Sequence, residues 1–179
     1  MQRVAQGDAL AFRRLSDAHL PAIFTYASRL LRNSAEAQDV AQETFLKVWL
    51  NARNYEPKAR VSTWIHAIAR NLAIDRLRKS KRRGEHYELD EERETAPASD
   101  RPSQLLEKKL SAQAFNDALS LLPERQQSAL LLRHEQGLSQ GEIAVVLACS
   151  IDAVESLLKR ARQTLKEQLQ AQNPESHRE

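Results

Sequence analysis

The chain has 179 residues, and its 27 Lys and Arg against 24 Asp and Glu give a net charge of only +3. It contains 4 Gly, 5% aromatic residues and 1 Cys, so an internal disulfide is excluded and helix-forming residues dominate. No apolar run reaches the roughly 20 residues that span a bilayer, and the first residues contain no secretory segment. We expect an all-α protein of two small domains, located in the cytoplasm and not inserted into a membrane.

The first part of the chain is predicted to form about four helices. Apolar stripes favour helices over 8–20 and 21–31, and a third over about 33–52. The core face of the third helix would consist of Ala37, Val40, Ala41, Thr44, Phe45, Val48 and Trp49. Its second face mixes polar and apolar side chains, namely Asp39, Gln42, Glu43, Leu46 and Leu50. Such a stripe is typical of a surface on which a helical partner docks, and a solvated face with two stray leucines is the alternative.

A polar loop over 55–62 precedes a helix predicted over about 64–79, with Ser62 or Thr63 as its cap. Trp64 starts the apolar stripe of this helix, so we expect it in the core. Six basic residues crowd the end of the helix, namely Arg76, Arg78, Lys79, Lys81, Arg82 and Arg83. This density favours contact with phosphates over a solvated helix end, and a neighbouring aromatic loop could hold a splayed base.

Charge and proline divide the chain after this basic run. Residues 84–102 are acidic, polar and contain Pro97 and Pro102, so they are predicted to form a flexible linker. The residues from 170 to 179 are predicted to form a frayed polar tail.

Residues 138–162 have the spacing of a helix-turn-helix. Apolar stripes are predicted on two successive helices, with Ile143, Ala144 and Leu147 on the first and Val154, Leu157 and Leu158 on the second. A tight corner at 148–150 joins them, and Cys149 would plug the turn as a small hydrophobe. Ser139 with Glu142 reads as a capping box, and Ser150 with Asp152 starts the second helix. An exposed second helix of this kind lies in the major groove of DNA, although a plain helical hairpin shares part of the pattern.

Nothing in the sequence indicates catalysis. We find no phosphate-binding Gly-rich loop and no acidic pair with metal-ligand spacing. Cys149 has no orienting partner for nucleophilic chemistry, and His134 with Glu135 lacks further ligands for zinc. We therefore expect no enzyme activity, no cofactor and no metal.

Four segments follow one another along the chain: GDALAFRRL, AEAQDVAQETFLKVW, STWIHAIARNLAIDRLRKSKRR and LLPERQQSALLLRHEQGLSQGEIAVVLACSIDAVESLLKRARQTL. In order and spacing they resemble the conserved segments of the extracytoplasmic-function (ECF, group IV) sigma factors of bacterial RNA polymerase. The resemblance implies region two over 1–83, a linker over 84–103 and region four, with the polar tail, over 104–179. It also implies an initiation factor that binds core polymerase, recognises two promoter elements and assists DNA melting. An anti-sigma factor, often membrane-bound, is implied as its inhibitor.

The resemblance assigns tasks to particular residues. Region two would dock on the clamp helices of the largest polymerase subunit through Asp39, Gln42, Glu43 and Leu46. It would capture the separated strand of the downstream (−10) element through Lys58, Arg60, Ser62, Asn71, Arg76, Arg78 and Lys79, with Asn71 at the family's base-pocket position. Region four would pack near the β-subunit flap and read the upstream (−35) element through Asp152, Ala153, Glu155, Ser156, Lys159, Arg160 and Arg162.

One departure concerns the start of the recognition helix. Family members often have Thr-Val-Lys/Arg-Ser-Arg where this chain has Ala-Val-Glu-Ser-Leu at 153–157. Glu155 could accept from a cytosine amino group or orient a neighbouring arginine, so the base preference at this element stays open. Two other classes are the alternatives to a sigma factor: a stand-alone helix-turn-helix regulator, and a helical adaptor without a DNA role.

Overall fold

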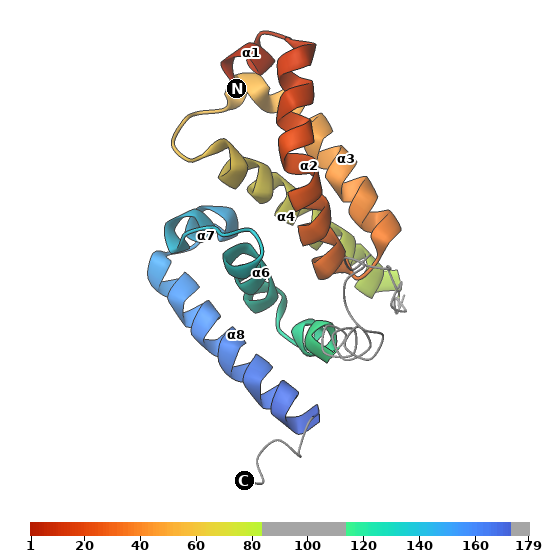
Figure 1. Ribbon diagram of the computed structural model, residues 1–179, viewed down its shortest axis with the longest axis vertical. Coiled ribbons are helices and arrows are strands. Elements are labelled where there is room, and N and C mark those ends of the chain that lie inside the picture. The colour runs from red at the N-terminus through yellow and green to blue at the C-terminus, as the bar shows by residue number, and fades with distance from the viewer. Residues whose placement is uncertain (84–113, 173–179) are drawn as a thin grey trace, which may run out of the picture.

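The computed structural model describes residues 1–83 and 114–172, in two groups of helices (Figure 1). The first group contains α1 (Gln2–Ala5), α2 (Ala9–Leu31), α3 (Ser34–Asn51), the 3₁₀ turn η1 (Ala52–Asn54) and α4 (Val61–Arg83). The second contains a helical stretch over 114–120, α6 (Glu124–His134), α7 (Gln140–Leu147) and α8 (Ile151–Gln172). These ranges contain no strand, which confirms the all-α prediction. The predicted linker over 84–103 lies outside the described residues.

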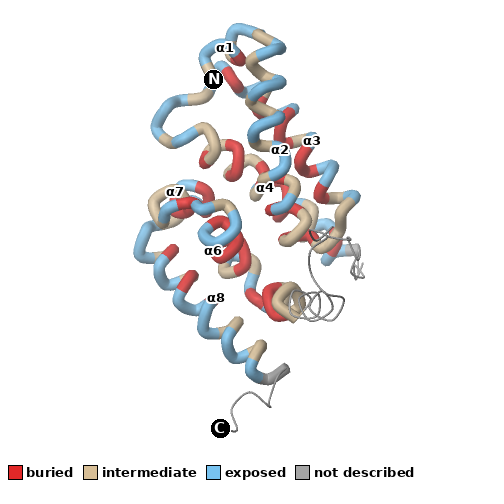
Figure 2. Tube along the Cα trace, viewed as in Figure 1, coloured by how far each residue is buried: buried red, intermediate tan, exposed pale blue. Residues whose placement is uncertain are grey.

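Side-chain caps fix the starts of α2 and α3. Asp8 accepts a hydrogen bond from the Ala11 amide at 2.9 Å at the start of α2, and Asn33 does the same for the Glu36 amide at 2.9 Å at the start of α3. Packing of α2, α3 and α4 against one another then buries one stripe of each helix, as the red segments of Figure 2 show. The prediction of a helix over about 33–52 is confirmed.

The predicted break between helices at Pro21 is wrong, because α2 runs without interruption from Ala9 to Leu31. Proline removes the amide that would bond to the Asp17 carbonyl. Both residues lie on the exposed face, where water can solvate that carbonyl, while Ile23 and Tyr26 beyond them are fully buried. Burial of the helix beyond the proline therefore outweighs the one lost helical bond.

Two other helix ends differ from the predictions. Helix α4 begins at Val61, so Ser62 and Thr63 lie in its first turn and neither is the predicted cap. The Trp64 amide instead donates to the Arg60 carbonyl at 3.1 Å. At the other end of the chain, α8 extends to Gln172, past the predicted start of the tail at 170. Leu165 and Leu169 continue its half-buried stripe and explain the extra length.

The helix-turn-helix has the predicted local structure. Ser139 and Glu142 form the capping box of α7, and the Ser150 hydroxyl accepts from the Ala153 amide at 3.2 Å. Ala148 ends α7 in the left-handed conformation at φ 48°, which turns the chain into α8. Ile143 and Val154 are fully buried between the helices.

The two helical groups pack against each other, which the sequence left open. A single apolar cluster runs from Tyr26 and Leu30 of the first group to Leu119 and Leu131 of the second. Polar contacts also cross the boundary: the buried Tyr26 hydroxyl donates to Ser128 Oγ at 3.2 Å. Burial raises the pKa of Tyr26 to about 12, so its phenol is protonated and available as a donor.

Candidate docking and nucleic-acid interfaces

The mixed stripe predicted on α3 lies on the surface. Asp39, Gln42, Glu43, Leu46 and Leu50 share one side of the helix because they are three, four or seven positions apart. Leu46 is 56% exposed and Leu50 is 68% exposed. The partner-facing stripe inferred from the sequence is thus an exposed apolar strip bordered by carboxylates.

A groove of about 460 Å³ lies beside this stripe, between α2 and α3. Its walls include Phe12, Leu20, Phe45, Leu46 and Trp49, and the rings of Phe12 and Trp49 meet edge to face with centroids 5.0 Å apart. The sequence assigned Trp49 to the core, but it is half-buried at the groove. Periodicity alone does not separate a core position from a groove wall, because both lie on the inward side of the helix.

Helix α4 presents part of its predicted DNA-contacting set to solvent. Asn71, Arg78 and Lys79 are exposed and share one face, since they are spaced by seven and eight positions. The side chain of Arg78 is 67% exposed and lies 4.0 Å from Asp75. This face combines an amide with two cations, and exposed cations can follow a nucleic-acid backbone.

Arg76, assigned to the same DNA-contacting set, points elsewhere. Its Nη1 lies 3.4 Å from Asp39 Oδ2 and its Nη2 lies 3.4 Å from Glu43 Oε2. The guanidinium therefore bridges two carboxylates of the predicted docking stripe. Sequence spacing did not show this contact, because it joins residues of two different helices.

The loop before α4 is ordered by its aromatic residue. The Tyr55 hydroxyl donates to the Ala59 carbonyl at 2.7 Å, and its ring lies 5.3 Å from that of Trp64. Trp64 was predicted in the core, but it is half-buried, packed against an apolar cluster that includes Phe45 and Ile65. Lys58 pairs with Glu56 at the exposed tip of the loop.

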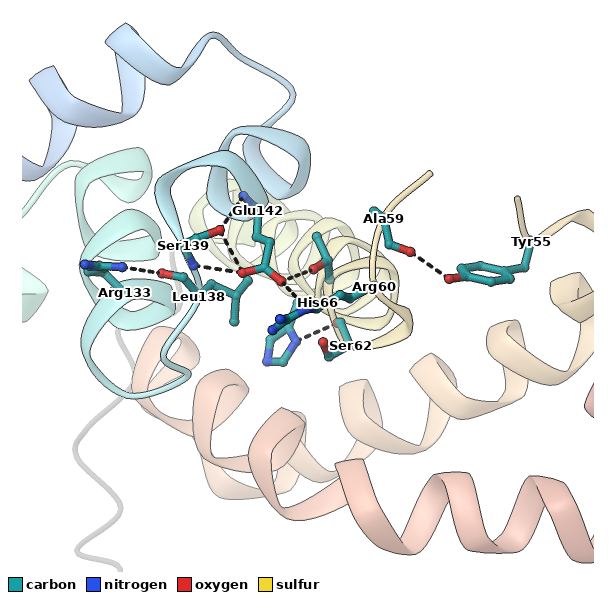
Figure 3. A network of polar contacts seen from close by, with 10 residues as sticks. Tyr55, Ala59, Arg60, Ser62, His66, Arg133, Leu138, Ser139 and Glu142 are labelled. Atoms are coloured by element: carbon teal, nitrogen blue, oxygen red, sulfur yellow. Dashed lines mark hydrogen bonds and ion pairs between the residues drawn. The ribbon is translucent and has the colours of Figure 1, made fainter. Parts of the chain in front are cut away.

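The start of α4 contacts the helix-turn-helix through Glu142 (Figure 3). The Thr63 hydroxyl donates to Glu142 Oε1 at 3.2 Å, and Arg60 Nε lies 3.6 Å from the same oxygen. The other oxygen, Oε2, accepts from the amide of Ser139 at 2.9 Å and from its hydroxyl at 2.8 Å. These bonds, led by those from Ser139, lower the pKa of Glu142 and keep it ionised.

His66 lies one turn further along α4 at the same boundary. Its Nδ1 donates to the Ser62 carbonyl at 2.8 Å, and its Nε2 lies 3.3 Å from the side-chain amide of Gln136. Burial lowers the pKa of His66 below its ordinary value and favours the neutral ring. Arg70 pairs with Glu124 further along the same helix.

The recognition helix α8 keeps its polar face open. Its predicted contacts Asp152, Glu155, Ser156, Lys159, Arg160 and Arg162 are all exposed, and Ala153 is half-buried. Leu157, by contrast, is half-buried against the apolar core, so it packs on the inner side of the helix. Of the three residues that differ from the family pattern at 153–157, only Glu155 is therefore exposed.

The described residues contain no group of His, Cys, Asp or Glu that could hold a metal ion. None of the described helices is long and apolar enough to cross a membrane. Cys149 is half-buried at the corner between α7 and α8.

Comparisons with known proteins match both halves of the chain. The Sigma-70 region 2 family model matches residues 15–83, and the Sigma-70, region 4 model matches residues 112–165. Both helical groups thus carry the conserved regions of a sigma-70-type transcription initiation factor.

Individual relatives indicate to which class of sigma factor the chain belongs. The ECF sigma factor SigW of Bacillus subtilis is 30% identical over 179 residues, covering 94% of each chain. The sigma-H factor of Pseudomonas aeruginosa is 31% identical over 180 residues, covering 95% of this chain and 92% of that one. Among solved structures, the sigma factor RpoE in complex with the anti-sigma factor NepR from Bartonella quintana has a TM-score of 0.71 at 25% identity. That match covers 89% of this chain and 97% of the other. The chain therefore belongs to the ECF sigma factors, a family of initiation factors not known as enzymes, and the resemblance inferred from its sequence is confirmed.

Proposed function

We propose that this ECF sigma factor docks on core RNA polymerase through the stripe on α3. The observation that carries this proposal is the exposed apolar strip of Leu46 and Leu50, bordered by Asp39, Gln42 and Glu43 and backed by the groove. A helical partner with apolar knobs and basic flanks fits such a surface. The clamp helices of the largest polymerase subunit are the partner that the family implies.

Capture of the −10 element is assigned to the loop before α4 and to one face of that helix. Asn71 would contact an extruded base, and Lys58, Arg60, Ser62, Arg78 and Lys79 would line the strand. Unstacking a base costs a few kcal/mol, so duplex opening has to be offset by holding the separated strand against protein. Trapping the strand in this way needs no nucleotide hydrolysis and no cofactor.

Recognition of the −35 element is assigned to the exposed face of α8. Lys159, Arg160 and Arg162 would contact phosphates or base edges, with Asp152, Ala153 and Ser156 beside them. Glu155 would accept from a cytosine amino group or orient a neighbouring arginine.

Reading both elements on one duplex requires the two helical groups to separate. The elements are centred roughly 25 base pairs apart, which is about 85 Å along B-form DNA. The contacts of Tyr26 with Ser128 and of Thr63 with Glu142 hold the two DNA-reading surfaces much closer than that. We infer that this closed arrangement opens when the factor assembles with polymerase and promoter.

We further propose that an anti-sigma factor, which in this family is often membrane-bound, stabilises the closed form in the cytoplasm. The similarity to RpoE in its complex with NepR supports this proposal, because the match spans both helical groups at once. A ligand that binds only the closed form shifts the population toward it and blocks initiation.

Core binding tests the docking surface directly. The double variant Asp39→Lys with Gln42→Lys should abolish comigration with purified bacterial core polymerase on native gels, while circular dichroism stays unchanged. The matched control is Asp17→Lys with Gln163→Lys, which makes the same charge change at exposed sites on α2 and α8 and should bind normally. Normal binding by the first variant would show that the docking face is misplaced. A wild-type chain that binds promoter DNA but never core would be a stand-alone regulator, and one that binds neither would be an adaptor.

A further inference from the structure

Arg76 links the docking stripe on α3 to the DNA-contacting residues of α4. It lies on α4, within the basic run assigned to DNA, yet its guanidinium bridges Asp39 and Glu43 of the docking stripe at 3.4 Å each. Asp39 and Glu43 are four positions apart on α3, so one planar guanidinium can face both carboxylates at once. The side chain of Arg76 is only 28% exposed, against 67% for Arg78.

This arrangement makes the two surfaces compete for the same charges. While Arg76 is held by two carboxylates, its charge is compensated, and the carboxylates repel any phosphate that approaches it. The same pairing compensates Asp39 and Glu43 toward a basic group of a docking partner. A docking partner that pairs with the two carboxylates and a DNA phosphate that pairs with Arg76 both break this same ion-pair cluster. Binding of either one therefore raises the affinity for the other, because coupling between binding sites is reciprocal.

We propose that Arg76 couples polymerase docking to DNA binding: a cation of the docking partner takes over Asp39 and Glu43 and releases Arg76 toward the DNA backbone. The proposal rests on the docking surface proposed above. It makes Arg76 a positioning residue in the free protein and a phosphate contact only in the assembled complex. The free factor is thereby kept from binding DNA with its full positive charge, which limits its capture by non-promoter sites.

Binding of a short fluorescein-labelled single-stranded oligonucleotide to the full chain, without polymerase, tests the release of Arg76. The charge-neutralised variant Asp39→Asn with Glu43→Gln should bind about three- to fivefold more tightly than wild type, the effect of losing one modest surface ion-pair cluster. The slope of log affinity against log salt should steepen by about 0.7, as for one added phosphate contact.

General electrostatics predicts some gain from removing any two carboxylates, so two comparisons isolate Arg76. The variant Asp17→Asn with Glu167→Gln makes the same charge change on α2 and α8 and should show clearly less than twofold gain. In an Arg76→Gln background, the Asp39→Asn and Glu43→Gln changes should raise DNA affinity no more than this control does. An undiminished gain in that background would overturn the proposal. Arg76→Met, which keeps the aliphatic stem, replaces Arg76→Gln if the latter loses helical content.

Affinity for core polymerase gives the reciprocal readout. Because Arg76 competes with the partner's cation, Arg76→Gln alone should bind core about threefold more tightly in the absence of DNA. Weaker binding would mean that Arg76 only holds the docking carboxylates in place, and the coupling would be wrong. If Asp39→Asn with Glu43→Gln leaves core affinity unchanged, the docking surface itself fails, which separates the two proposals.

Discussion

Thr63 and Glu142 are 79 positions apart in sequence, yet the Thr63 hydroxyl donates to the Glu142 carboxylate at 3.2 Å across the boundary between α4 and α7. The same carboxylate completes the capping box with Ser139. One side chain therefore starts α7, the first helix of the helix-turn-helix, and also binds the first turn of α4. The two DNA-reading units are joined by a group that the second unit needs for its own local structure.

Removal of the Thr63 hydroxyl tests the strength of this junction. Thr63→Val keeps the shape of a fully buried side chain but leaves Glu142 with one donor fewer, so the free energy of unfolding should fall by about 1 kcal/mol. Urea denaturation followed by circular dichroism measures the change. In a Glu142→Gln background, which preserves a capping-box residue type, the effect of Thr63→Val should shrink. Equal effects in both backgrounds would show that Glu142 is not the relevant partner.

Acid should weaken the closed structure through His66. Burial lowers the pKa of His66 below its ordinary value near 6.5, so the unfolded chain takes up a proton at a higher pH than the folded one does. Stability is then full above about pH 7 and declines as the pH falls through about 6.5 toward the lowered pKa of the folded state. Urea midpoints measured from about pH 7.5 down to about pH 5.5 should therefore fall, and His66→Phe should flatten this dependence.

Two other titratable groups near His66 also affect how stability depends on pH, and their contributions must be distinguished from that of His66. Burial also lowers the pKa of His19, so His19 contributes with the same sign, and the same series in His19→Gln isolates His66. Glu142 has a lowered pKa and loses its stabilising charge only below its ordinary value of 4.5, outside this range. A full acid dependence in His66→Phe would contradict the assignment.

A reversible crosslink tests whether the two groups must separate. Arg32 Nη2 lies 2.8 Å from Asp117 Oδ1 across the boundary, so cysteines at these positions, with Cys149→Ala, can be joined by a disulfide-containing bismaleimide. The locked protein should fail to direct promoter-specific transcription, and reduction of the linker should restore it. The matched control joins Arg13→Cys to Asp17→Cys within α2, an exposed pair in contact at 3.8 Å, and should remain active. Full activity of the locked interdomain pair would exclude opening.

Features that depend on a few neighbouring residues could be predicted from the sequence. The capping box of Ser139 and Glu142, the corner after Leu147 and the exposed stripe around Leu46 all have the predicted structure. Each is encoded by spacing within about two helical turns. The two conserved regions could likewise be recognised in the sequence, because their segments follow one another in the family's order, and the family matches confirm them.

Features that depend on contacts between distant segments could not be predicted. Thr63 has the residue type of a helix cap, but its hydroxyl is used by Glu142 of another helix. Arg76 belongs to a basic run, but two carboxylates on α3 hold it. Proline inside a helix usually kinks or breaks it, but α2 continues through Pro21 to the buried Ile23 and Tyr26. In each case tertiary packing outweighs a local preference that was correctly identified.

The central claim is that the two helical groups recognise two promoter elements. Run-off transcription tests it most directly, with purified core polymerase, this chain and fragmented genomic DNA of the source bacterium. Sequencing of the 5′ ends should give discrete start sites that share two upstream motifs, one near −10 and one near −35. Arg160→Ala should weaken selection at the upstream motif, and Asn71→Ala selection at the downstream one. Start sites absent with this chain, or sharing only one motif, would contradict the account.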